Sequence, residues 1–163
     1  MRRAAALLLL CWCAAAFAQL PEWSGGLTPA LRLQDLDGKP HALEDYRGKV
    51  VLVNFWATWC EPCREEMPSI ERLRASMAGR PFAVLAVNLA EPESRVRGFL
   101  NQVPLAFPVL LDQDRAAAKA WKVRFLPATF IVGPDGRVRY SYFGEFDWSR
   151  DSVRKTIAAL LPR

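Results

Sequence analysis

Two cysteines separated by two residues, Cys60 and Cys63, carry the most reactive chemistry in this sequence. A disulfide between residues this close closes a very small loop and adds little stability through chain entropy. The pair is therefore suited to reversible thiol-disulfide exchange, with a static structural disulfide as the alternative. Zinc binding would need two more ligands at metal spacing, whereas the single histidine, His41, lies far upstream. We expect no metal and no cofactor.

The two cysteines follow a predicted strand and open a predicted helix. Residues 49–56 (KVVLVNFW) form a continuous β-branched and aromatic run, which is typical of a strand buried on both faces. Over residues 61–78, apolar side chains recur at helical spacing, namely Met67, Ile70, Leu73 and Met77. Gly79 and Pro81 then end the predicted helix.

A helix N-terminus favours a thiolate, because the backbone N–H groups there carry partial positive charge. We therefore expect Cys60 to be the attacking thiol and Cys63, one turn inward, to resolve the mixed disulfide. Pro62 suits an early helical position, where its missing N–H costs nothing. The carboxylate of Glu61 opposes thiolate formation at Cys60.

The remaining pattern alternates strands and helices and predicts one α/β domain over residues 31–163, without repeats. Its sheet is expected to be mixed and to carry helices on both faces. The predicted elements are a hairpin over 31–43, a strand over 82–89, a helix from 93 to about 102, a strand over 107–111, a helix over 114–121 capped by Asp112 or Asp114, a hairpin of strands 128–132 and 137–143, and a helix over about 147–160.

The N-terminus has the pattern of a secretory signal. Arg2 and Arg3 precede an apolar stretch, and Ala16-Phe17-Ala18 matches a cleavage site, so residues 1–18 are predicted to be a signal peptide. The stretch is shorter than the roughly 20 residues of a membrane-spanning helix; an uncleaved anchor is the alternative. Residues 19–30 are predicted to be a linker, and the protein is expected to be periplasmic or otherwise extracytoplasmic.

Composition supports an ordinary globular domain. The 163 residues are 52% hydrophobic and 24% charged, which excludes a disordered tail and a small disulfide scaffold. The formal charge of +5 comes from 22 basic and 17 acidic residues without a run of five like charges, so we expect no nucleic-acid binding.

The segment FWATWCEPCREEMP (residues 55–68) resembles the thioredoxin superfamily, in particular the bacterial TlpA/ResA/CcmG-like thiol-disulfide oxidoreductases. The likeness continues in Leu36-Asp37-Gly38-Lys39, in Arg47-Gly48-Lys49 and in residues 125–130 (FLPATF), and it covers roughly residues 28–160. It implies a thioredoxin-like fold with an N-terminal β-hairpin and a central helix-strand insertion within about residues 90–113.

The resemblance also implies roles for residues around the cysteines. Pro127 would be a cis-proline facing the two cysteines, with Leu126 meeting the backbone of a partner. The substrate-binding residues would be Trp59, Glu61, Pro62, Leu126 and Pro127.

One position departs from thioredoxin itself. Asn54 stands where thioredoxin carries a buried aspartate, and Glu66 matches the acidic residue of the TlpA/ResA-like helix. The implied catalytic set is Cys60, Cys63 and Glu66; the alternative for Glu66 is a solvated charge like that of Glu65.

The function implied by the resemblance is reduction of disulfides in exported proteins, for example apocytochrome c during cytochrome c maturation. A membrane thiol reductase would donate the electrons, and the protein would act as a monomer. Three alternatives stay open: a disulfide-forming oxidant, a non-enzymatic binding or chaperone module, and a peroxiredoxin-like peroxidase, although Thr58 is not spaced from Cys60 as a peroxidase requires.

Overall fold

The central strand β3 (Val50–Trp56) is buried along its whole length and organises the sheet. It pairs in parallel with β4 (Phe82–Leu89) and antiparallel with β6 (Ala128–Val132). β5 (Val109–Asp112) lies parallel to β4, and β7 (Val138–Phe143) lies antiparallel to β6, so the strand order is β5-β4-β3-β6-β7. This computed structural model describes residues 20–162, and the predicted signal peptide over residues 1–18 lies outside them.

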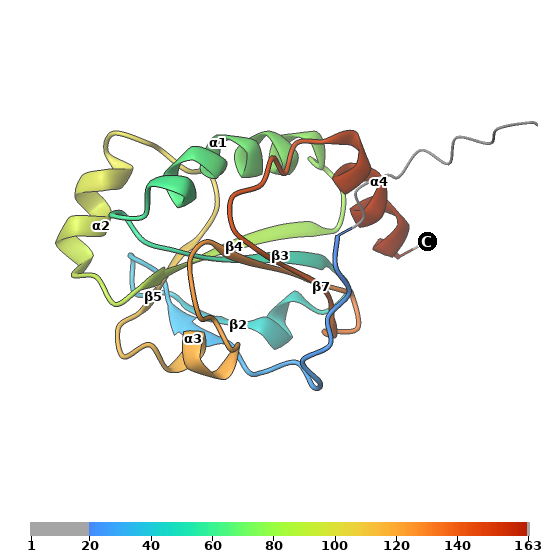
Figure 1. Cartoon of the computed structure of the whole chain (residues 1–163), viewed down its shortest axis with the longest axis horizontal. Coiled ribbons are helices and arrows are strands. Elements are labelled where there is room, and N and C mark those ends of the chain that lie inside the picture. The colour runs from blue at the N-terminus through green and yellow to red at the C-terminus, as the bar shows by residue number, and fades with distance from the viewer. Residues whose placement is uncertain (1–19, 163) are drawn as a thin grey trace, which may run out of the picture.

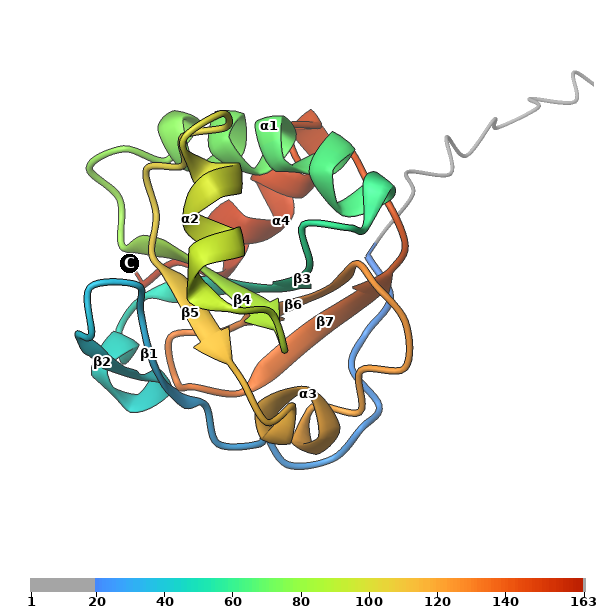
Figure 2. The ribbon, with the colours of Figure 1, turned by 90° about the vertical axis from the view of Figure 1, so that its left-hand side faces the viewer.

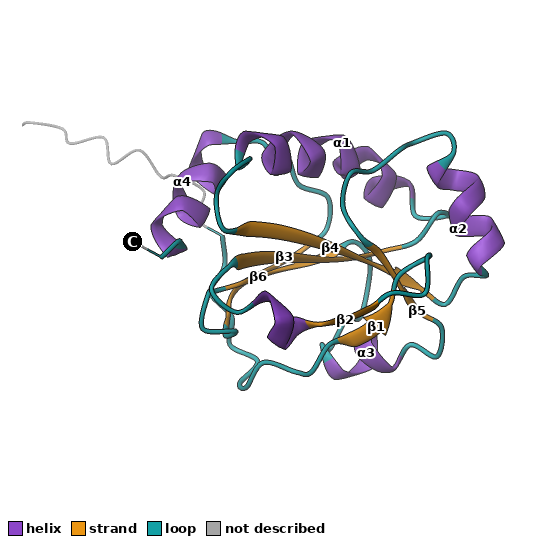
Figure 3. Ribbon diagram, turned by 180° about the vertical axis from the view of Figure 1, so that it is seen from behind, coloured by secondary structure: helices purple, strands orange, loops and turns teal. Residues whose placement is uncertain are grey.

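Helices cover both faces of the sheet, as predicted (Figure 1). One face carries α1 (Glu61–Ser76), α2 (Glu93–Leu100) and α4 (Asp151–Leu160). The opposite face carries α3 (Ala116–Ala120) and the N-terminal elements described next, and Figure 3 shows this arrangement from behind. Side chains alternate along β3, so that each face receives its own row of apolar groups and forms its own core cluster.

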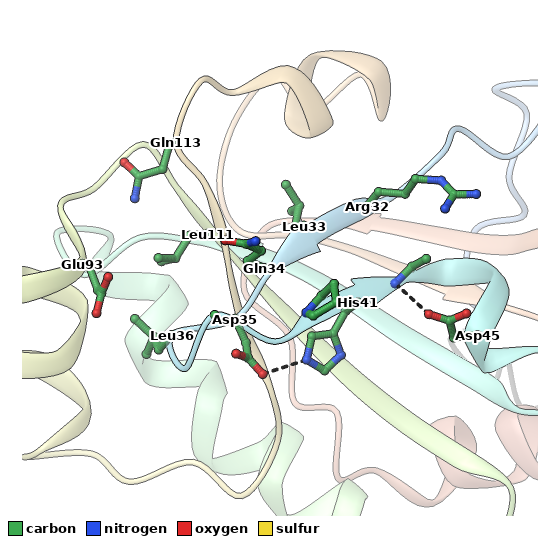
Figure 4. Close-up of a pocket in the computed structure, with 13 residues that line it drawn as sticks. Arg32, Leu33, Gln34, Asp35, Leu36, His41, Asp45, Glu93, Leu111 and Gln113 are labelled. Atoms are coloured by element: carbon green, nitrogen blue, oxygen red, sulfur yellow. Dashed lines mark hydrogen bonds and ion pairs between the residues drawn. The ribbon is translucent and has the colours of Figure 1, made fainter.

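The predicted N-terminal hairpin is confirmed. β1 (Arg32–Gln34) and β2 (Pro40–Ala42) pair antiparallel, and the 3-10 helix η1 (Leu43–Tyr46) follows. A hollow of about 720 Å³ lies beside this hairpin, and none of the predicted site residues lines it (Figure 4).

A series of side-chain hydrogen bonds closes the hairpin. Within it, the two ring nitrogens of the buried His41 contact Asp35 Oδ2 at 2.7 Å and the Tyr46 hydroxyl at 2.6 Å. Burial acts to raise the pKa of Asp35, but hydrogen bonds from His41 and from two backbone N–H groups outweigh it and hold the pKa below its usual value. The histidine thus stabilises the hairpin.

Two helices begin later than the sequence predicts. α4 begins at Asp151 instead of about residue 147, because the Asp147 carboxylate accepts the Ser149 N–H at 3.0 Å and holds a turn there. α3 begins at Ala116, and both candidate caps contribute: Asp112 accepts two N–H groups of its first turn and Asp114 accepts the Ala116 N–H. β5 begins at Val109 instead of residue 107, since Pro108 has no N–H to give to the sheet.

Both edges of the sheet are covered. Residues 20–23, part of the predicted linker, run along β7, where the Trp23 N–H donates to the Arg139 carbonyl at 2.9 Å and the Ser141 N–H donates to the Pro21 carbonyl at 3.0 Å. At the other edge, β1 lies beside β5 (Figure 2), and Asp35 forms an isolated bridge to Leu110 of β5. Within residues 20–162, no helix has the length and apolar character needed to cross a membrane.

Candidate active site

Three chain segments meet at one end of the sheet, and Cys60 and Cys63 lie there. β3 ends at Trp56, and the parallel register of β4 places Asn88 beside it. Because β6 runs antiparallel to β3, its first residue, Ala128, pairs with Phe55 at the same end. The loops after β3 and β4 and the segment before β6 therefore share one edge.

The two cysteines form a disulfide with an S–S distance of 2.01 Å, so the structure represents the oxidised protein. Cys60 is the N-cap of α1, and Pro62 lies in its first turn, as predicted. Cys60 is 5% exposed and Cys63 is 0% exposed. Cys60 is thus the sulfur that another molecule can approach first.

The residues predicted to contact a partner lie around the disulfide. Trp59 is 65% exposed, and it lines a hollow of about 290 Å³ together with Leu126. Glu61 and Pro62 are exposed at the start of α1. The Leu126–Pro127 bond is cis, which confirms that prediction, and Pro127 itself is buried. Leu126 also packs against the core cluster that contains both cysteines.

Glu66 is a buried carboxylate behind the disulfide, in contrast to its exposed neighbour Glu65. Its Oε1 accepts a hydrogen bond from Asn54 Nδ2 at 2.7 Å. Its Oε2 accepts one from Trp148 Nε1 at 3.0 Å and one from the Phe146 N–H at 3.3 Å. Asn54 is therefore a direct partner of Glu66.

Burial raises the pKa of Glu66 to about 7, although its three hydrogen bonds partly oppose this by stabilising the carboxylate. The negative charge of Glu145 adds to the rise. A carboxyl group with this pKa gives and takes a proton near neutral pH. Cys63 and Glu66 are three residues apart on α1 and are both buried, so they are neighbours on one face of the helix.

A second buried carboxylate, Glu91, fixes the loop that leads into Cys60. Its Oε2 accepts the Thr58 N–H at 2.6 Å and Asn88 Nδ2 at 2.8 Å, and its Oε1 accepts the Thr58 hydroxyl at 2.6 Å. Glu91 is 4% exposed and lies two residues after the end of β4. The sequence pattern assigns Glu91 no role and places it only before the next predicted helix. The sequence signal that could have identified Glu91 is an acidic residue just after an apolar strand, which ends at the edge of the sheet where the cysteines lie.

Comparison with known proteins identifies relatives over most of the chain. The sequence profile of the AhpC/TSA family matches residues 25–141. The thiol-disulfide oxidoreductase ResA of Geobacillus thermodenitrificans is 35% identical over 138 residues, which cover 85% of this chain and 78% of that protein. ResA of Bacillus subtilis is 39% identical over 114 residues, which cover 70% of this chain and 64% of that protein.

A solved structure shares the fold. The crystal structure of a putative thiol:disulfide interchange protein DsbE from Chlorobium tepidum superposes with a TM-score of 0.78 at 30% identity, covering 88% of this chain and all of that one. The thioredoxin-like fold predicted from the sequence is thereby confirmed.

The raised pKa of Glu66 predicts how stability depends on pH. The unfolded chain binds this proton only below about pH 4.5 and the folded chain below about pH 7, so proton binding stabilises the fold at low pH. As the pH rises from about 4.5 to 7, this stabilisation is lost, and the loss amounts to roughly 3 kcal/mol. Denaturant unfolding of the oxidised protein should show that Glu66→Gln removes this part of the pH dependence. Glu65→Gln is the control, and equal pH profiles for the wild type and Glu66→Gln would contradict the assignment.

The Glu91 contacts predict that Glu91→Ala destabilises the protein by roughly 2–3 kcal/mol, because it leaves buried donors without an acceptor. Glu91→Gln should retain most of the stability, since its amide can donate to the Thr58 hydroxyl and its oxygen can accept from the Thr58 N–H. Hydrogen exchange at the Thr58 amide should speed up in the alanine variant and stay slow in the glutamine variant. Unchanged exchange in Glu91→Ala would show that the loop is held by other contacts.

Proposed function

The chain belongs to the AhpC/TSA family and is a thiol-disulfide oxidoreductase of the ResA and DsbE type, and from this premise we propose that it reduces disulfides in exported proteins outside the cytoplasm. One observation carries the proposal: the Cys60–Cys63 disulfide opens α1 with the buried carboxyl group of Glu66 one turn behind it. Apocytochrome c is a suitable substrate, because its two cysteines must be reduced before haem is attached.

The reaction moves two electrons from the protein dithiol to the partner disulfide. The Cys60 thiolate attacks one sulfur of the partner, which forms a mixed disulfide and releases one partner thiolate. Cys63 then attacks the Cys60 sulfur, which forms the Cys60–Cys63 disulfide and releases the second partner thiolate. The partner gains two electrons and two protons, and an external dithiol donor must reduce Cys60–Cys63 for the next cycle.

Glu66 is proposed to carry the proton that the resolving thiol exchanges. As a carboxylate it takes the proton of Cys63 when that thiol attacks. As a carboxylic acid it returns a proton to Cys63 when the donor opens the disulfide. Because its pKa is about 7, the carboxylate and the carboxylic acid are both populated at neutral pH.

The exposed surface beside Cys60 is proposed to receive the partner. Trp59 and Leu126 border one hollow, Glu61 and Pro62 flank Cys60 along the chain, and Pro127 supports the segment that contains Leu126.

We further propose the chain organisation that export requires. Residues 1–18 form the export signal, either removed or retained as an anchor, and residues 19–30 lead from it to the domain over residues 31–163, with residues 20–23 packed along β7. A membrane thiol reductase supplies the electrons, since the proposed reaction consumes a dithiol in each cycle. The domain acts as a monomer.

The alternative functions predict different outcomes. A peroxidase would consume peroxide in a thiol-regenerating assay; here the Thr58 hydroxyl donates to Glu91 and the two cysteines are bonded to each other. A disulfide-forming oxidant would have a reduction potential well above that of reductants. A binding or chaperone module would keep its function when both cysteines are replaced by serine.

Trapping tests the partner reaction. Cys63→Ser removes the resolving thiol, so mixed disulfides between Cys60 and exported cysteine proteins should accumulate and should disappear on reduction. Cys60→Ser is the matched control and should trap far less, because Cys63 is fully buried. The absence of any trapped exported protein would count against the proposed function, and stronger trapping through Cys63 would reverse the assignment of the two thiols.

The pH profile tests Glu66. Glu66→Gln should lower the rate of disulfide exchange by about tenfold or more, toward the low end of the effects of general acid–base catalysis. It should also remove an inflection near pH 7 from the curve of rate against pH. Removal of a nearby negative charge should also increase the thiolate fraction of the reduced protein, measured by ultraviolet absorbance. If Glu66→Gln matches the surface control Glu65→Gln in both measurements, the proton travels by another route.

A further inference from the structure

A groove beside the disulfide combines exposed aromatic rings with arginines. We name it the partner groove and define it by Trp59, Val123, Phe125 and Leu126 together with Arg115 and Arg124, all of which line the hollow of about 290 Å³. Its residues come from the loop after β3, the loop after β5 and the segment before β6, so it lies at the same sheet edge as Cys60.

The aromatic side chains of the groove are exposed to an unusual degree. Trp59 is 65% exposed and Phe125 is 57% exposed, and both are among the few large apolar side chains outside the core. The Phe125 ring lies 5.3 Å from that of Phe143, which lines an adjoining hollow of about 440 Å³ shared with Arg124. An apolar strip therefore leads away from the disulfide, and such strips mark interaction sites.

Two arginines, Arg115 and Arg124, contribute positive charge to the groove. Arg115 and Arg124 are exposed, and none of the ion pairs within residues 20–162 includes either of them. The carboxylates close to them along the chain and at the end of β4 have other partners: Asp112 and Asp114 cap α3, and Glu91 holds Thr58 and Asn88. Glu61, which follows Cys60 at the start of α1, is an exposed acid near the disulfide.

The backbone around the groove is held in an uncommon conformation. The non-glycine residues of positive φ within residues 20–162 are Ala90, Arg115 and Lys122, at 55°, 62° and 57°. Ala90 and Arg115 line the hollow of about 290 Å³, and Lys122 lines the adjoining hollow of about 440 Å³. Positive φ is unfavourable for a residue that carries a side chain, and such residues collect at active sites and ligand sites.

We propose that the partner groove selects target disulfides whose cysteine is flanked by an apolar and an acidic side chain. The apolar side chain packs against Trp59, Phe125 and Leu126, and the carboxylate pairs with Arg115 or Arg124, whose planar guanidinium groups bind carboxylates in bidentate fashion. This inference rests on the proposed function, because it assigns the substrate class of the same reaction. The partner is therefore an extended, acidic segment of a disulfide-containing protein.

The test uses three disulfide-linked peptide pairs of equal length, in which the residues beside the cysteine are Leu and Asp, Leu and Asn, or Leu and Lys. For the reduced protein, kcat/KM should be about three- to tenfold higher for the Asp peptide than for the Lys peptide, as expected for one or two exposed ion pairs. The ratio should approach one at about 1 M salt, where the Debye length is roughly 3 Å. Replacement of Leu by Gly in each peptide should lower all three values.

Matched variants assign the preference to the groove. Arg124→Glu should reverse the order of the Asp and Lys peptides, and Arg115→Asn, which tolerates positive φ, should reduce the ratio. Arg80→Glu carries the same change of charge at the far end of α1 and should keep the wild-type ratio. Equal kcat/KM for the Asp and Lys peptides, or a reversal caused equally by Arg80→Glu, would overturn this inference while the proposed function stands. Failure to reduce any of the peptide disulfides would overturn the proposed function itself.

Discussion

β3 pairs in parallel with β4 and antiparallel with β6, and this opposite pairing on its two sides determines where the chemistry lies. A parallel neighbour ends where β3 ends, and an antiparallel neighbour begins there. The loop with the cysteines, the segment with Glu91 and the segment with Leu126 and Pro127 therefore meet without any long connection. The register of β3 matters as well, because a one-residue slip would carry Asn54 to the opposite face, away from Glu66.

Sequence reasoning recovered those parts of the site that depend on local pattern or on a long motif. The strand before Cys60, the helix after it and the hairpin near His41 follow from periodicity and turn residues, and Glu66 and Pro127 follow from the family resemblance. It did not identify Trp148 or Glu91 as neighbours of the site. Their contacts join residues 33 to 82 positions apart, and local pattern carries no information about such pairings.

Polar burial distinguishes this site from the surrounding core. Glu66 and Glu91 are both nearly inaccessible to solvent, and each accepts three hydrogen bonds. The donors to Glu66 are two side chains and one backbone N–H, from β3 and from the segment before α4, so that carboxyl group links α1 to both. Glu91 instead links the ends of β3 and β4. Burial of a carboxylate costs free energy unless hydrogen bonds compensate for the lost water. Glu66 and Glu91 are compensated in this way, and both lie near the disulfide.

The coverage of both sheet edges has a consequence for the encounter of this domain with incompletely folded chains. Incompletely folded polypeptides readily add as extra strands to an open sheet edge, which is a common route to aggregation. Here residues 20–23 occupy the β7 edge and the bridge from Asp35 occupies the β5 edge. An incoming chain therefore cannot pair as an extra strand along β5 or β7. Its backbone can form hydrogen bonds only at the ends of the strands. Covered edges of this kind lower the tendency of the domain to take such chains into its sheet and to aggregate with them.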